Sequence, residues 1–212
     1  RNGLAAFDIT TGTATAWNPN VSGDVLSLAI SGSNVYVGGQ FITVNGATTR
    51  NGLAAFDITT GIATAWDPNT NNAVSALAIS GSNVYAGGTF TTINGGTTRN
   101  YLASIDITTG TATAWNPNMT GSTVTALAIN GSNIYAGGTY TTINGTTTRN
   151  NLAAIDITTG TTTAWDPNMS GDVLSLVISG GYIYAGGTFT SAGNRLSKSY
   201  SVFNLGTGLL LP

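Results

Sequence analysis

The chain repeats itself with a period of about 49 residues, and this period constrains its fold more than any other feature. The pattern RN-x-LA-x-x-DITTG-x-x-TAW begins at Arg1, Arg50, Arg99 and Arg149, which are 49, 49 and 50 residues apart, and Arg195 follows after 46 more. Periods of 20 to 50 residues are typical of solenoids, propellers and other arrays. Each repeat is therefore expected to fold as one unit that buries its apolar faces against its neighbours.

Four apolar stretches in each period have the character of β-strands. In the period that begins at Val25 they are "VLSLAIS", "NVYVGGQF", "LAAFDI" and the stretch that ends in Trp66, with a long polar loop, "ITVNGATTR", in the middle. They are short and rich in β-branched and aromatic residues, and Gly, Asn, Ser or Thr clusters bound them. "SGSN" and "TTG" join them in pairs and suit tight hairpins. No segment keeps a helical period, so we predict an all-β fold.

A four-stranded meander of this length matches a β-propeller blade. We predict one propeller domain over residues 1–212, built from four-stranded antiparallel blades of about 49 residues, with four repeats plus an extra half-blade. Its parts are an outer half-blade (1–24), three repeats (25–73, 74–123 and 124–172) and an irregular terminal repeat (173–212). Leu26, Leu28 and Ile30 alternate with small residues, as expected where neighbouring blades cover both sheet faces. A β-solenoid is the rival fold, although its coils are usually shorter.

Two stretches carry a resemblance to known families. "VYVGGQFITVNGATTRNGLAAFDITTG" resembles the delta-60 type of β-propeller repeat of secreted and surface proteins of bacteria, and all four repeats keep its frame. "AFDITTGTATAW" is similar to the blade motif of pyrroloquinoline-quinone dehydrogenases, in which a Trp docks neighbouring blades together, but four residues instead of about three separate Gly12 from Trp17. The first resemblance implies a propeller fold and an extracellular or cell-surface location. The second concerns blade construction.

The repeated charged and aromatic residues are interpreted as structural. A Trp recurs just before an [ND]PN turn and is expected to pack between blades; these are Trp17, Trp66, Trp115 and Trp165. An Asp recurs in DITTG and is expected to accept N–H bonds from its own turn; these are Asp8, Asp57, Asp106 and Asp156. An Arg stands seven residues before each Asp, on the opposite face of an extended strand; these are Arg1, Arg50, Arg99 and Arg149. A pair between adjacent blades, or an Arg/Asp ring that binds an anion or sugar, stays open.

One turn position exchanges amide and carboxylate from repeat to repeat. It is occupied by Asn18, Asp67, Asn116 and Asp166. A metal ligand or a general acid would not tolerate this exchange. The position is therefore interpreted as a turn residue. Gly38 and Gly39, which follow a strand, are interpreted as a place of close backbone approach.

The composition leaves little material for catalysis. The chain has no His, Cys or Glu, so the usual general base and the thiol nucleophile are missing. Pairs of Asp would lie a blade apart rather than the roughly 5 to 9.5 Å that a glycosidase needs. We predict no enzyme and no catalytic, cofactor or metal site. Six Lys and Arg residues and a net charge of −2 argue against nucleic acid, and no apolar run is long enough to insert into a membrane.

Two function classes remain. The first is a non-catalytic extracellular or cell-surface module for adhesion, display or self-assembly, with identical copies (in a ring or filament) or the remainder of a longer chain as partners. The second is a carbohydrate-binding propeller with glycans in equivalent pockets between blades. Its groove would use the recurring aromatic residues Phe41, Phe90, Tyr140 and Phe189, which are otherwise expected to be core residues.

The chain has one hairpin more than its inner strands need. Inner hairpins begin at Val25, Val74, Val124 and Val173, and outer ones at Leu4, Leu53, Leu102, Leu152 and, in degraded form, near Tyr200. In one arrangement residues 4–17 complete the blade that begins at Val173 and close the ring. In the other they are the outer half of a blade whose inner half lies in another chain or in sequence outside these residues. Since soluble proteins cover sheet edges and apolar faces, we expect closure or assembly with identical copies.

Overall fold

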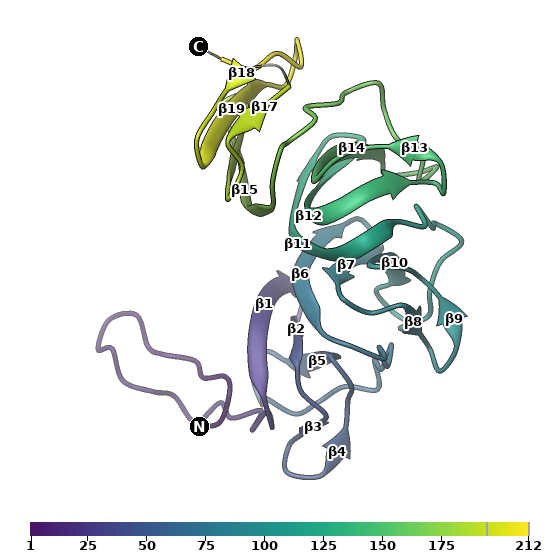
Figure 1. The fold of residues 1–212 in the computed structure, drawn as a ribbon. Coiled ribbons are helices and arrows are strands. Elements are labelled where there is room, and N and C mark those ends of the chain that lie inside the picture. The colour runs from purple at the N-terminus through teal and green to yellow at the C-terminus, as the bar shows by residue number, and fades with distance from the viewer. Residues whose placement is uncertain (194, 212) are drawn as a thin grey trace. The chain divides into compact units, whose positions relative to one another are not determined.

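A computed structural model describes residues 1–193 and 195–211, and every regular element within them is a β-strand (Figure 1). The prediction of an all-β fold is confirmed. The contacts divide the chain into two compact units. One consists of Arg1–Ala86, Phe90–Thr98 and Ser104–Thr113, and the other of Gly87–Thr89, Arg99–Ala103 and Ala114–Pro212.

Each repeat builds one antiparallel sheet around its "VYxGG" strand. The first sheet has the order β1 (Asp24–Ser31), β2 (Asn34–Gln40), β5 (Leu53–Asp57). The second joins β6 (Val74–Ser80), β7 (Asn83–Gly88) and β10 (Leu102–Asp106), with β7 in the centre. In the third, β12 (Asn133–Ile143) lies between β11 (Thr120–Asn130) and β14 (Leu152–Asp156). The fourth has the order β15 (Val173–Ser179), β16 (Tyr182–Gly187), β19 (Tyr200–Asn204).

The loops that the sequence suggested to be merely polar contain small hairpins. They are β3 (Thr43–Val44) with β4 (Thr48–Thr49), β8 (Thr92–Ile93) with β9 (Thr97–Thr98), and β17 (Ser191–Ala192) with β18 (Arg195–Leu196). In the third repeat β12 itself runs on into such a hairpin and pairs with β13 (Thr147–Thr148).

The predicted fourth strand of each blade is reduced to a single bridge. The stretch before Trp66 touches the sheet only at Phe56↔Ala63, and the next two repeats have the equivalent bridges Ile105↔Ala112 and Ile155↔Thr162. The Arg50 guanidinium provides the reason, because its Nη2 donates to the Thr64 carbonyl oxygen at 2.6 Å and so takes an acceptor that a longer strand would use. The described sheets therefore have three main strands where four were expected.

The surplus N-terminal hairpin does not complete the fourth sheet. Residues 4–17 form only the bridge Phe7↔Ala14, whereas β16 pairs with β19 from the C-terminal tail. The arrangement in which residues 4–17 pair with the strands after Val173 is thus not formed. The tail is the nearer strand along the chain, and it places Phe203, which is 2% exposed, opposite Ile183.

The expectation that neighbours cover both faces of every sheet is wrong for the first sheet. Leu26, Leu28 and Ile30 of β1 are 51%, 51% and 64% exposed, whereas their copies in β6 are half-buried. β1 and β6 contact each other along the opposite face of β1. The apolar alternation is therefore the same in both strands, but in the described residues only one face of β1 has a sheet against it.

Candidate functional site

The repeated Trp side chains reach from each repeat to the DITTG turn of the next. The indole Nε1 of Trp17 donates to the carbonyl oxygen of Asp57 at 3.0 Å, and Trp66 donates in the same way to Asp106 at 3.0 Å. Trp115 repeats this contact with Asp156 in the second unit, also at 3.0 Å. The three indoles are almost fully buried. Each ring therefore joins two consecutive repeats.

A glycine lies beneath each of these indoles. A Cβ added to Gly61 would come within 3.3 Å of Nε1 and Cδ1 of Trp17, and Gly61 has φ +73°, a conformation that favours glycine. Gly110 has the same relation to Trp66, with φ +75°. The glycine of each TTG turn is therefore needed both for the turn and for the contact with the ring.

The Asp of each DITTG turn is held by its own loop. Oδ1 of Asp57 accepts the backbone N–H groups of Thr59 and Thr60 at 3.0 and 2.7 Å and the Thr60 hydroxyl at 2.9 Å. These bonds favour the ionised form and lower the pKa of Asp57 below its ordinary value of 3.8, with the Thr60 N–H as the largest cause. The same turn and the same shift recur at Asp8, Asp106 and Asp156.

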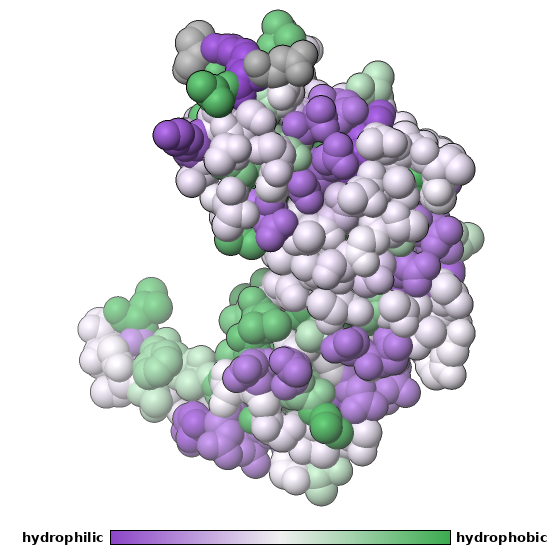
Figure 2. Space-filling model, viewed as in Figure 1, coloured by the Kyte–Doolittle hydropathy of each residue, from purple (hydrophilic) through white to green (hydrophobic). Residues whose placement is uncertain are grey.

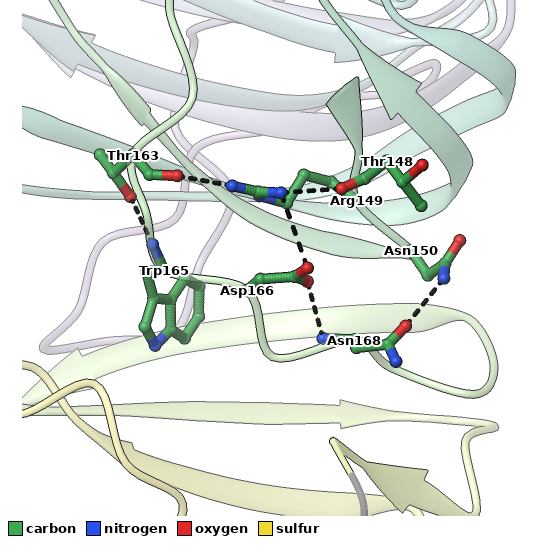
Figure 3. Close-up of polar contacts among 7 residues, drawn as sticks. All are labelled: Thr148, Arg149, Asn150, Thr163, Trp165, Asp166 and Asn168. Carbon is green, nitrogen blue, oxygen red and sulfur yellow. Dashed lines mark hydrogen bonds and ion pairs between the residues drawn. The ribbon is translucent and has the colours of Figure 1, made fainter. Parts of the chain in front are cut away.

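The repeated Arg fastens the fourth stretch of its own repeat (Figure 3). Nη2 of Arg149 donates to the Thr163 carbonyl at 2.7 Å, and Nη1 donates to the Thr148 carbonyl at 2.8 Å and lies 3.6 Å from Oδ2 of Asp166. Asp166 also accepts the N–H of Asn168 at 3.1 Å. Its carboxylate therefore serves the turn and the ion pair together.

Arg50 makes the same contacts as Arg149 and pairs with Asp67 at 3.6 Å. The Arg partner is thus the Asp of the [ND]PN turn and not the Asp of DITTG. The interpretation of Asp67 and Asp166 as turn residues alone missed this pair. Its signal was the fixed spacing of 17 residues between each Arg and the exchanging position. In the first repeat, which has Asn18, Arg1 keeps only the carbonyl contact, to Thr15.

The recurring aromatic residues proposed for a ligand groove lie in the core. Phe41, Phe90, Tyr140 and Phe189 are all less than 5% exposed. The Tyr140 hydroxyl donates to the Ala136 carbonyl at 2.5 Å, and burial raises the pKa of Tyr140 well above its ordinary value. These rings cannot stack on a ligand from solvent, so the groove built from them is wrong.

Two equivalent pockets lie instead beside the Trp contacts. One, of about 450 Å³, is lined by Asn34, Tyr36, Trp66 and Ile107 among others. The other, of about 520 Å³, is lined by their copies Asn133, Tyr135, Trp165 and Gly206. Each lies within one of the compact units, between a tyrosine of one sheet and the turn that the next Trp contacts. Their repetition makes them the candidate binding sites of the described residues.

Neither a metal cluster nor a membrane helix was found in the residues described. No group of three or more His, Cys, Asp or Glu side chains is placed to hold a metal ion there. In the same residues no helix is long and apolar enough to cross a membrane.

Solved structures share the fold at low sequence identity. The computationally designed Ika8 protein has a TM-score of 0.65 and 21% identity over 98% of this chain and 54% of that chain. The computationally designed Ika4 protein has a TM-score of 0.57 and 19% identity over 87% and 92%. A chain of the mitotic checkpoint complex has a TM-score of 0.65 and 16% identity over 96% and 55%. The chain thus spans about half the length of the Ika8 chain. At these identities the likeness concerns the fold alone.

Comparison at the level of families is more specific. No curated protein matches the chain. A family model described as outer membrane protein assembly factor BamB matches residues 1–195. The similarity to pyrroloquinoline-quinone dehydrogenase blades fits this match, whereas the delta-60 resemblance is not part of it. Since the model covers nearly all of the sequence, the chain belongs to this family, PQQ_2, whose repeats are of the β-propeller type.

Proposed function

We propose that the chain is a non-catalytic structural and interaction module, extracellular or at the cell surface, that assembles through its sheet faces. One observation carries the proposal. The repeated Trp and Asp side chains and the described contacts of the repeated Arg all serve the fold, while apolar side chains of β1 face solvent. Figure 2 shows hydrophobic side chains gathered over this strand. Exposed apolar patches of this kind mark interaction surfaces.

The sequence and the family support the other parts of the proposal. Without His, Cys or Glu, the chain lacks the residues that most often act as base or nucleophile. The description of the matching family model names an outer membrane assembly factor, which agrees with a role in interactions near a bacterial surface. Each sheet, together with the stretch that ends in its Trp, would be one blade of about 49 residues.

Self-assembly is tested by light scattering over a concentration series. We expect a weight-average mass that rises above the 21.4 kDa of one chain as the concentration increases. A mass that stays at 21.4 kDa throughout would contradict assembly. The location is tested separately by adding protease to intact source cells, since a surface protein is digested and an internal one is not.

Carbohydrate binding is the second candidate, and the paired pockets beside Trp66 and Trp165 favour it. Repeated pockets with an aromatic edge and polar neighbours suit repeated sugar units. Trp165 is the more exposed of the two rings, although neither offers a full open face. A glycan array read together with Trp fluorescence tests this function. Saturable binding that changes the fluorescence supports it, and an array without a bound glycan contradicts it.

A further inference from the structure

The first DITTG turn has no indole above it. A Cβ built on Gly61, Gly110, Gly160 or Gly208 would come within 3.4 Å of a Trp side chain, in each case the Trp of the preceding repeat. Among the described residues, a Cβ on Gly12 would meet nothing within 4 Å. Gly12 has φ +69°, so its turn has the same form as the others. The docking place for a Trp is therefore built but vacant in the first repeat.

The strand that should precede this turn also lacks a partner. Phe7 is 63% exposed, whereas its copies Phe56, Ile105 and Ile155 are fully buried in strands that pair with β2, β7 and β12. Residues 4–8 carry the same L-A-x-x-D pattern as these strands. They are a strand sequence without a strand to pair with.

The outer face of β1 is the third vacancy. In the first unit, Cγ1 of Val74 and Cγ of Leu77 lie 2.8 and 3.3 Å from the position of a Cβ on Gly38, so β6 rests on the glycine of the preceding sheet. The copy of Leu77 in the first sheet is Leu28, which is half exposed. Val25, the copy of Val74, is likewise only partly buried. This face has the residues of a sheet contact and no sheet against it.

The last repeat presents the complementary features. Gly186 is the copy of Gly38, and a Cβ there would meet nothing closer than 3.9 Å. Ser27 accepts the backbone N–H of Leu77 across the first sheet contact at 2.9 Å. Its copy Ser175 is exposed, although the two sheets between them have alanine at this position. The last sheet thus keeps the acceptor that a following copy of the β1 sheet would need.

The C-terminal tail fills the outer place of the last sheet poorly. Residues 200–204 pair with β16 in the register that β5 uses on β2, and Trp165 donates to the Gly208 carbonyl at 3.0 Å. Tyr200 is 55% exposed, whereas its copies Leu53, Leu102 and Leu152 are fully buried. The tail also has Asn204 in place of the Asp and no Trp after its turn. It imitates an outer hairpin and buries less than a complete one.

We propose that residues 4–17 of a second copy of this chain replace the tail on β16. Leu4 to Asp8 would take the register of residues 200–204, Trp165 would dock on Gly12, and the β1 face would rest on Gly186. The exchange fills all three vacancies with contacts that the chain already makes internally. It rests on the proposed function of self-assembly and specifies the two surfaces that meet. Such head-to-tail contacts, made by exchanging an identical element, are a low-cost route to rings or filaments.

Two observations favour a second copy over the chain's own N-terminus. Four blades are the lower limit of propellers, so closure of these repeats alone is the tightest case. The whole chain also corresponds to about half of the Ika8 chain, so two copies would supply the length of that fold. A strand added to an open sheet is also a recurrent mode of association.

A matched pair of glycine variants tests the vacancy. Gly12 and Gly32 both lie in exposed turns at positive φ, and a Cβ on either meets nothing within 4 Å. Gly12→Val and Gly32→Val should therefore strain the single chain to a similar degree, but only Gly12→Val should block a docked indole. We expect Gly32→Val to assemble like the unchanged chain and Gly12→Val to stay at 21.4 kDa in light scattering. If the unchanged chain and Gly12→Val assemble equally, the exchange is wrong while self-assembly stands. If the unchanged chain never assembles, the proposed function itself fails.

A disulfide trap identifies the partner strand. The chain has no cysteine, and Ala5 would lie opposite Ala185 because Ser201 occupies that register position now. Directly opposite residues are close enough for a disulfide. The double variant Ala5→Cys/Ala185→Cys should give covalent dimers and higher multiples on a non-reducing gel, and Ala14→Cys/Ala185→Cys should not. A disulfide within one chain would show closure and overturn the second copy. Equal cross-linking of both variants, or none in either, would overturn the exchange.

Discussion

The indole of Trp66 lies edge-on to the phenol ring of Tyr36, with ring centroids 5.1 Å apart and planes at 85°. The two residues belong to the same repeat, but both also reach the next one. The indole donates to the Asp106 carbonyl at 3.0 Å, and the Tyr36 hydroxyl donates to the Ile107 carbonyl at 3.3 Å. Two adjacent carbonyls of one turn are therefore held by an aromatic pair from the repeat before it.

Replacing Trp66 by alanine should destabilise the fold strongly. The side chain is 4% exposed, and emptying a buried site of this size costs about 3 to 5 kcal/mol. Thermal unfolding followed by circular dichroism measures the loss. Trp66→Phe is the matched control, since it keeps a ring against Tyr36 but removes the N–H bond, and it should lose less. A melting temperature of Trp66→Ala within a degree or two of the unchanged chain would contradict the packing.

The four DITTG carboxylates should make the fold sensitive to acid. Their pKa values are lowered by hydrogen bonds from Thr N–H groups in the folded state. A lowered folded pKa means that the unfolded chain binds protons first, so the stabilisation is present above the ordinary value of 3.8 and is lost as the pH falls below it. Denaturant midpoints should therefore decrease from pH 5 to pH 2.

Asparagine is the control for this titration, because Asn204 in the tail already accepts the N–H groups of Gly206 and Thr207 at 2.9 Å. Changing Asp8, Asp57, Asp106 and Asp156 together to Asn should keep an acceptor at each turn and remove its charge. The stability of this variant should depend much less on pH in the acid range. An unchanged acid profile would place the pH sensitivity elsewhere.

The ion pair of Arg149 should matter less than its carbonyl contacts. The Asp166 carboxylate is 38% exposed, and an exposed ion pair contributes at most about 1 kcal/mol. Asp166→Asn, which copies Asn18 and Asn116 of other repeats, should therefore have a small effect that added salt reduces. Arg149→Ala also leaves the Thr163 carbonyl without its donor and should cost clearly more. Chemical unfolding at low and high salt compares the two, and equal losses would contradict this ranking.

Much of the fold follows from local sequence, because each strand pairs with its neighbour along the chain. The period and the hairpin turns after Gly32 and Gly61 were sufficient to predict the β-strands around them. The failure at the fourth strand has a local cause as well, since the Arg50 contact with the Thr64 carbonyl competes with the ladder. Spacing along an extended strand gives no sign of such a contact across a loop.

The burial of individual side chains was less accessible to sequence reasoning. Phe7 and Phe56 stand in the same L-A-A-F-D pattern, but one is exposed and the other fully buried. The difference depends on whether a neighbouring strand is present, which no local pattern records. For the same reason the sequence could not tell that residues 200–204, rather than residues 4–8, would pair with β16.

Two glycines at the same repeat position should respond in opposite ways to an added methyl group. A Cβ on Gly137 would lie 2.6 Å from Cγ1 of Val173, so Gly137→Ala overpacks the contact between the third and fourth sheets and should cost about 1 to 3 kcal/mol. A Cβ on Gly186 has open space, and neither residue has positive φ. Gly186→Ala should therefore be neutral or add about 0.4 to 1 kcal/mol by restricting the unfolded chain. Thermal melts in dilute solution, where single chains dominate, compare the two variants. Equal destabilisation would mean that a sheet already covers Gly186 in the isolated chain, and the vacancy on the last sheet would then not exist.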